Sequence, residues 1–276
     1  MIEIKNLSKS FGEVRALDDI SLSIGPGVHG LLGPGGSGKT TLLRCLTRII
    51  DPDSGEINIS AKITLLPQKF DFFNTMLVIE LMEHLAKLKK VPIEKIESQT
   101  EELLTKVNLF AKLRTKVGAL TDDMNRRLGL ALSLQSDPGV ILVDEPETEP
   151  APEERLNFKQ LLADVGRQRS LIVAGHDVKD VEDLCDRIII LRGGRVITHD
   201  TQAGIAGFAK GKVYKIAVAD SDKLVEPYHV TRRFFEGEVE YLRILSTQRQ
   251  VAAEQTPDLE DSYRLYIWTS EQGYEK

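Results

Sequence analysis

The sequence predicts an α/β fold in which a layered sheet is covered by helices and interrupted by a helical insertion. Short, almost wholly apolar runs typical of buried parallel strands stand at Val140–Val143, Ser170–Ala174 and Arg187–Leu191. Helices expected at 152–167 and 178–185 separate these strands, giving the alternating order of an α/β core. Between about 74 and 135 the apolar period becomes helical, with leucines on one face at 77, 81, 85 and 88.

The first sixty-odd residues are expected to be mainly β-structure, punctuated by Gly12, Gly25, Pro26 and Gly27. The expected strands are 2–5, 16–24, 28–32, 56–59 and 62–66, with one helix at 42–49. Beyond Phe208 the chain becomes richer in glycine, and we expect strands at 212–219, 229–235 and 239–246 and a helix at 259–268. The sequence therefore predicts one large domain over 1–208, with its helical insertion at about 74–135, and a small α/β extension over 209–276.

Composition narrows the class of protein. The 276 residues are 41% hydrophobic and 28% charged, as is ordinary for a globular protein, and the net charge is −6 with an isoelectric point near 5.5. The acidic balance argues against a nucleic-acid partner. We see no apolar run near the roughly 20 residues that span a bilayer, and no signal peptide at Met1–Lys5. Cys45 and Cys185 are expected to be buried free thiols in a reducing compartment.

Residues 33–41 match the phosphate-binding P-loop pattern, in which Gly33, Gly38, Lys39 and Thr40 are the fixed positions. Glycine lets the backbone approach a polyphosphate, and the helix that follows offers its positive end. Lys39 can reach the β- and γ-phosphates, and the Thr40 hydroxyl can bind Mg²⁺. The ATP-binding residues expected here are Gly33, Pro34, Gly35, Gly36, Ser37, Gly38, Lys39, Thr40 and Thr41.

Polar residues follow three of the expected core strands. Asp144 and Glu145 end the run 140–143, where Asp144 can hold Mg²⁺ and Glu145 can polarise a water for attack on the γ-phosphate. His176 follows 170–174 and can contact the γ-phosphate or that water. Gln68 follows 62–66 and can reach Mg²⁺ or the water through its amide oxygen. Phe11 can stack on a base.

The order of these elements resembles that of the ATP-binding subunits of ABC transporters, over about residues 1–208. The matching segments are Leu7–Gly12, Gly33–Thr41, Leu66–Gln68, Asp144–Pro146 and His176–Asp177. The resemblance implies a P-loop core with an antiparallel β subdomain and a helical subdomain, ATP and Mg²⁺ as cofactors, and separate membrane subunits as partners. Gly27–Gly33, Arg126–Ala131 and Pro257–Tyr263 are similar to the branch that exports drugs, antibiotics and polymers.

Two segments depart from the family pattern. In this family a signature loop, Leu-Ser-Gly-Gly-Gln or -Met, closes over the ATP of a second subunit; here the stretch is Leu120, Thr121, Asp122, Asp123 and Met124. A carboxylate crowds the phosphate, and aspartate at a helix start is expected to cap the N–H groups that phosphate needs. At about 4 Å and an effective dielectric of about 20, each like-charge pair costs roughly 4 kcal/mol. Ala151, flanked by Pro150 and Pro152, also replaces the usual aspartate of the next interfacial loop.

These departures leave more than one assembly open. An asymmetric dimer, with an ATPase partner of normal signature, explains why elements serving this chain's own ATP match while those serving a partner's ATP do not. A homodimer with two slow sites and a regulatory ATPase without a transport role are the alternatives. A membrane partner is expected to dock near 68–88, at Phe70, Phe72, Phe73 and Met76. The expected location is the cytoplasmic face of the membrane.

Overall fold

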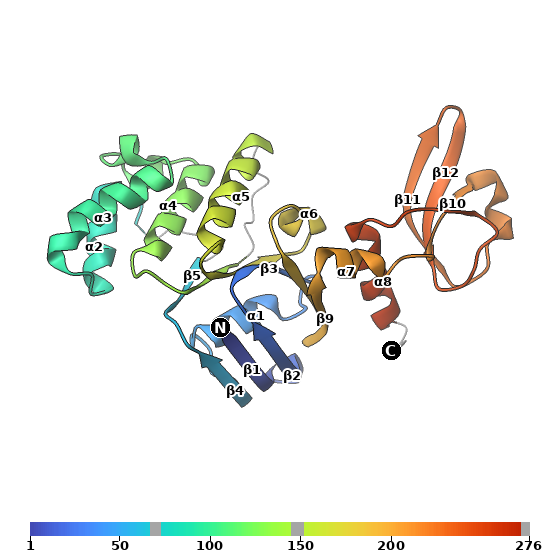
Figure 1. Ribbon diagram of the computed structural model, residues 1–276, viewed down its shortest axis with the longest axis horizontal. Helices are drawn as coiled ribbons and strands as arrows, with labels where there is room; N and C mark the ends of the chain where they lie inside the picture. Colours follow the sequence, from blue (N-terminus) through green and yellow to red (C-terminus); the bar gives the residue numbers. More distant parts are fainter. Residues whose placement is uncertain (67–72, 145–151, 272–276) are drawn as a thin grey trace.

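The computed structural model describes residues 1–66, 73–144 and 152–271. Three sheets organise these residues (Figure 1). The central one has the strand order β5-β6-β7-β3-β8-β9. Its strands are β3 (Gly27–Leu32), β5 (Ile63–Leu66), β6 (Val140–Val143), β7 (Ser170–Gly175), β8 (Arg187–Arg192) and β9 (Arg195–Thr201). All neighbours are parallel except β8 and β9, which form an antiparallel hairpin at the sheet edge.

A three-stranded antiparallel sheet lies below the central sheet in Figure 1. It consists of β1 (Ile2–Phe11), β2 (Val14–Ile24) and β4 (Ser54–Ile59), in the order β2-β1-β4. The helix α1 (Lys39–Leu46) lies between the two sheets, where Leu42, Leu43 and Cys45 are buried with Leu31 and Ile189. This core fixes the start of α1, and therefore the P-loop, against the end of β3.

Helices lie on the other face of the central sheet and beside it. They are α2 (Val78–Leu88), α3 (Ile93–Lys106), α4 (Asp122–Leu134), α5 (Pro152–Gly166) and α6 (Val178–Val181), with short 3₁₀ turns at Phe110–Lys112 and Val117–Ala119. The helices α2, α3 and α4 form the predicted helical insertion, at the left in Figure 1. Buried leucines such as Leu81, Leu104 and Leu128 join the insertion to the core between the central sheet and its helices.

The C-terminal part contains a separate four-stranded antiparallel sheet, at the right in Figure 1. It follows α7 (Gln202–Gly207) and comprises β10 (Val213–Ala217), β11 (Tyr228–Glu236), β12 (Val239–Ser246) and β13 (Ala253–Glu254), with a 3₁₀ turn at Val218–Lys223. The last helix, α8 (Leu259–Glu271), returns to the larger part of the molecule, where Leu259 and Tyr266 are buried in the core between the central sheet and its helices. Although α8 lies in the expected extension, it packs on α7 across the expected boundary at residue 208.

Several expected boundaries were wrong, for local reasons. The helix after the P-loop begins at Lys39, because Gly38 takes the left-handed conformation (φ 105°), and stops at Leu46, shortly before Arg48 at φ 58°. The helix expected over 178–185 ends at Val181, ahead of Asp183 at φ 62°. Within the region of helical period at 74–135, the apolar run 109–113 makes only a 3₁₀ turn. The hairpin strand β9 and the helix α7 were not predicted.

Candidate functional site

Strand register brings the predicted polar residues to one edge of the central sheet. Leu32 at the end of β3 lies opposite Gly175 at the end of β7, so the P-loop and His176 leave the sheet side by side. Val143 at the end of β6 pairs with Val173 on one side and Leu66 on the other. Because these strands are parallel, four chain segments emerge at their carboxyl ends, the usual place for a ligand in such a sheet.

Glycines shape the P-loop because a side chain would strike the backbone. A Cβ at Gly33 would lie 2.2 Å from the Leu191 carbonyl oxygen, and one at Gly38 would lie 2.4 Å from that of Ala16. Gly38 (φ 105°) and Gly36 (φ 75°) also adopt left-handed conformations that favour glycine. The loop is therefore built as a tight backbone cradle at the start of α1, where N–H groups and the helix dipole favour an anion.

The P-loop lysine and threonine lie inside the cradle. The Lys39 ammonium donates to the carbonyl oxygens of Gly33 (2.7 Å) and Pro34 (3.3 Å), and only 5% of the residue is exposed. The Thr40 hydroxyl donates to the Asp144 carboxylate at 3.1 Å, which joins the P-loop to the end of β6. Asp144 is itself buried. Lys39, which is expected to face phosphate, thus lies near Thr40 and Asp144, the two oxygen ligands expected for Mg²⁺. These residues come from elements about a hundred residues apart in the sequence.

The residues fit a nucleotide and its metal ion. The Ser37 hydroxyl is buried in the P-loop and has no hydrogen-bond partner among the described residues. An orphaned buried donor in a cradle of glycines suits a phosphate oxygen. A hydroxyl and a carboxylate in contact are the hard oxygen donors that Mg²⁺ prefers.

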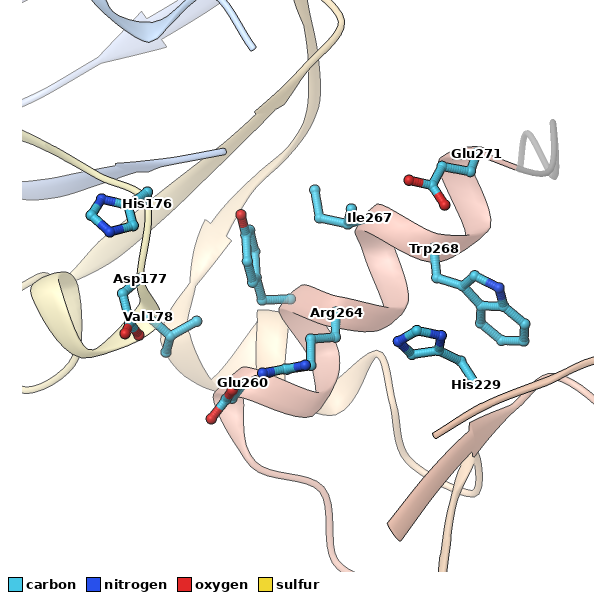
Figure 2. A pocket seen from close by; sticks show the side chains of 10 residues that line it. His176, Asp177, Val178, His229, Glu260, Arg264, Ile267, Trp268 and Glu271 are labelled. Carbon is cyan, nitrogen blue, oxygen red and sulfur yellow. Dashed lines mark hydrogen bonds and ion pairs between the residues drawn. The ribbon is translucent and has the colours of Figure 1, made fainter. Parts of the chain in front are cut away.

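His176 is exposed, directly after β7, and it lines a pocket of about 380 Å³. Asp177 caps the short helix α6 by accepting the Lys179 N–H at 3.0 Å, which holds the His176 turn in place. Figure 2 shows Trp268 of α8 and His229 of β11 on the opposite side of this pocket. The turn that carries His176 therefore faces the C-terminal segment on one side and the P-loop strand on the other.

Of the remaining predicted site residues, Phe11 lies in the described part of the chain, whereas Gln68 and Glu145 do not. Phe11 is 49% exposed near the tip of the β1–β2 hairpin, with the Lys9 ammonium 5.6 Å from its ring centre. An exposed aromatic ring there can stack on a base, and the same hairpin touches Gly38 through Ala16. Gln68 and Glu145 lie outside the described residues, as do Phe70, Phe72 and the altered loop 146–151.

The altered signature stretch starts α4, but its two aspartates do not cap the helix as expected. Thr121 is the N-cap, because its hydroxyl accepts the Met124 N–H at 3.2 Å. Asp122 and Asp123 instead occupy the first helical turn. The prediction placed the cap one or two residues too late, since threonine is itself a good capping residue.

The two aspartates have different surroundings. Asp123 forms an ion pair with Arg127 at 2.7 Å, and their side chains are only 10% and 14% exposed. Arg127 also donates to the backbone carbonyls of Val107 and Asn108, both at 3.0 Å. Asp122 is exposed, with no ion pair or hydrogen bond within the part of the chain that the structure describes. Arg126 lies in the field of both carboxylates, which offsets part of the lowering of its pKa by burial.

The strand over 187–191 was predicted, but the contacts of its end and of the following turn with the P-loop were missed. The Gly194 N–H donates to the Ser37 carbonyl at 3.0 Å, and the Leu191 carbonyl fills the space behind Gly33. The double glycine at 193–194, with φ values of 52° and 78°, is the signal that could have revealed this hairpin turn.

Comparison with known proteins shows what kind of site this is. The family model described as "ABC transporter" matches residues 17–148. The Nod factor export ATP-binding protein I of Paraburkholderia xenovorans is 30% identical over 218 residues, which cover 74% of this chain and 72% of that protein. The chain belongs to the ATP-binding proteins of ABC transporters. ATP hydrolysis coupled to transport is the activity of this family.

Two further matches place the ABC ATPase among its relatives. The methionine import ATP-binding protein of Xanthomonas oryzae pv. oryzae is 27% identical, and the match covers 92% of this chain and 77% of that protein. An ATP-binding cassette solved as a dimer, in a post-hydrolysis state with ADP and Pi, shares the fold with a TM-score of 0.65 at 24% identity. That match covers 73% of this chain and 98% of the solved one. The described helices include none that is long and apolar enough to cross a membrane.

Proposed function

We propose that this ABC ATPase is one half of an asymmetric ATPase dimer that powers export through separate membrane subunits. The observation that carries the asymmetry is the start of α4. Its first turn carries Asp122, exposed and unpaired among the described residues, where the family presents a glycine to the partner's phosphates. Among the elements assigned to this chain's own ATP, the P-loop, Asp144 and His176 lie at one sheet edge.

The two aspartates differ in the charge that they present to a partner's phosphates. The charge of Asp123 is balanced by Arg127 at 2.7 Å, so Asp122 supplies the repulsion toward a partner's phosphates. A single like-charge pair at about 4 Å costs roughly 4 kcal/mol at an effective dielectric of about 20, before screening by salt and by Arg126. Half of that value still exceeds the roughly 1 kcal/mol of one neutral hydrogen bond to the phosphate.

We assign the roles at the intact site as follows. Lys39 and the P-loop amides bind the phosphates, and Phe11 stacks on the base. Thr40, Asp144 and Gln68 hold Mg²⁺, which neutralises phosphate charge when bound. Glu145 polarises the attacking water, and His176 contacts the γ-phosphate. The Thr40–Asp144 contact and the exposed His176 beside the P-loop strand support these roles.

Two of the four residues expected to contact a membrane subunit belong mainly to the core. Phe73 and Met76 are half-buried and pack against the core of the helical insertion. They therefore serve mainly as core residues, and the proposal for a docking groove near 68–88 rests on family resemblance. Docking there places the subunit on the cytoplasmic face of the membrane. Export follows from the Nod factor relative and the branch resemblance, and import, as in the methionine relative, is the second candidate.

The proposal is tested by purifying the assembled transporter through a tag on this chain and measuring its native mass. Asymmetry requires one copy of this chain, one different ATPase subunit and the membrane subunits. Two copies of this chain would support the slow homodimer instead. In the same complex Glu145→Gln should abolish ATP turnover, while the isolated wild-type chain should turn over ATP poorly. Brisk hydrolysis by the isolated chain contradicts the asymmetric proposal.

A further inference from the structure

The end of β8 supports the P-loop at two points. The Leu191 carbonyl oxygen lies so close to Gly33 that a Cβ there would come within 2.2 Å of it. Three residues later, the Gly194 N–H donates to the Ser37 carbonyl at 3.0 Å. A shift of this strand end would therefore displace the phosphate cradle at both of these points.

The side chain of Arg192, between these two contacts, extends to the last turn of α8. Its guanidinium donates to the Ile267 carbonyl and, at 3.0 Å, to the Ser270 hydroxyl. It also pairs with the Glu271 carboxylate at 2.6 Å. A cation that satisfies the final carbonyls of a helix also interacts favourably with the helix dipole. The C-terminal end of α8 is thus fastened to the strand end behind the P-loop.

The other end of α8 is fastened to the C-terminal sheet. Arg243 of β12 pairs with Asp261, whose side chain is only 4% exposed. Asp261 and Asp258 also accept each other's backbone N–H groups, at 3.0 Å and 2.7 Å, which fixes the start of the helix. Hence a single helix joins the small sheet to the nucleotide site.

The middle of α8 lies along the turn that carries His176. Tyr263 and Ile267 pack against the core that includes Val178, two residues after His176. Figure 2 shows Ile267 and Glu271 on the helix with His176, Asp177 and Val178 across the pocket. Burial raises the pKa of the Tyr263 phenol, in agreement with this packing. The helix therefore borders two parts of the nucleotide site at once.

We propose that Arg192 is a positioning residue for the P-loop, and that through α8 it couples the C-terminal sheet to nucleotide binding. The coupling gives the C-terminal extension a role in setting nucleotide affinity. It requires only that the chain binds nucleotide, so it stands apart from the asymmetric dimer. Because coupling between two sites is reciprocal, nucleotide must stabilise the docking of α8 as much as docked α8 favours nucleotide.

The test is Mg-ADP binding by the full chain, measured by calorimetry. Arg192→Ala should raise the dissociation constant by about five-fold or more, the lower end of ordinary coupling between sites. Arg192→Lys keeps the charge but loses the forked geometry, and it should recover part of the affinity. Arg187→Ala is the control, since Arg187 begins the same strand at its far end and makes a longer ion pair, with Asp200 at 3.9 Å, that does not involve α8. That control should bind Mg-ADP as tightly as the wild-type chain.

Hydrogen exchange provides a second readout that a purely structural role would not change. Mg-ADP should slow amide exchange over 259–271 in the wild-type chain and fail to do so in Arg192→Ala. If that variant does not fold, Glu271→Gln, which removes only the ion pair, takes its place in both measurements. The proposal is overturned if a folded Arg192→Ala variant binds Mg-ADP with wild-type affinity. It is also overturned if Mg-ADP leaves amide exchange in α8 of the wild-type chain unchanged.

Discussion

Asp123 and Arg127 form a nearly buried ion pair one turn apart at the start of α4, with a nitrogen–oxygen distance of 2.7 Å. The pair ties the altered signature stretch to the end of α3 through the Val107 and Asn108 carbonyls that Arg127 also contacts. Asp123 therefore stabilises the fold, whereas the adjacent Asp122 is exposed to solvent.

The two aspartates should therefore affect stability differently. Asp123→Ala should lower the free energy of unfolding by about 2 kcal/mol, because it leaves Arg127 without its counter-charge in a mostly dehydrated place. Asp122→Ala should change it by less than about 0.5 kcal/mol, as is usual for an exposed substitution. Urea titration followed by circular dichroism measures both variants. Equal losses would show that the ion pair carries no special weight.

The same division predicts that Asp122 limits ATP hydrolysis. Asp122→Gly should raise the ATP turnover of the isolated chain at high protein concentration by about ten-fold, which corresponds to about 1.4 kcal/mol of relieved repulsion. Asp122→Asn removes the charge but keeps the Cβ, so it should gain less. Steady-state phosphate release measures these rates. Turnover that stays at the wild-type level in both variants would remove Asp122 as the cause of a poor partner site.

The Thr40 hydroxyl should determine how strongly Mg²⁺ improves nucleotide binding. Thr40→Val keeps the shape of the side chain but removes the oxygen that meets Asp144 at 3.1 Å, whereas Thr40→Ser keeps it. We expect Mg²⁺ to tighten ADP binding in the wild-type chain and in Thr40→Ser, and to lose about ten-fold of that effect in Thr40→Val. Fluorescence titration with and without EDTA gives the comparison. A full Mg²⁺ effect in Thr40→Val would place the metal elsewhere.

Stability should also fall in mild acid because of two packed histidines. Burial lowers the pKa of His29 and of His199, whose rings lie 5.7 Å apart between β3 and β9. Below pH 6.5 these histidines are therefore protonated in the unfolded chain but still neutral in the folded chain. The free energy of unfolding consequently decreases as the pH falls from 6.5 toward the lowered pKa values of the two histidines. The almost fully buried His29 alone gives a slope of at most about 1.4 kcal/mol per pH unit.

Urea midpoints at pH 8, 7, 6 and 5.5 check this slope. His199→Gln is the control, since it removes one titrating ring while leaving the strand intact, and it should make the decrease shallower. A midpoint that stays constant from pH 8 to 5.5 would mean that both rings accept protons without cost in the folded chain.

The sequence predicted the central strands and the P-loop because both depend on local patterns. Apolar runs such as 140–143 mark buried parallel strands, and the glycines at 33 and 38 are required by close backbone contacts that the structure confirms. Thr40 and Asp144 were each expected to bind Mg²⁺, but their direct contact at 3.1 Å was not predicted. The other site residues were assigned from the resemblance to the family.

What could not be predicted involves partners distant in sequence. The ion pair between Asp123 and Arg127 was not predicted. An aspartate that caps a helix and one that forms an ion pair look alike in sequence, and Asp123 was interpreted as a cap. Arg192 lies 75 residues from the Ile267 carbonyl that it contacts, and no local signal connects a strand end to a helix end. The docking of α8 on the larger part likewise follows from tertiary packing alone.

The two edges of the central sheet limit how this subunit can associate. One edge is β5, only four residues long, and the other is β9, which begins at Arg195 and carries Asp200, both exposed. Short and charged edge strands resist pairing with strands of another chain. A growing ribbon of fused sheets is thereby disfavoured, and contacts between subunits are left to loops and helix ends.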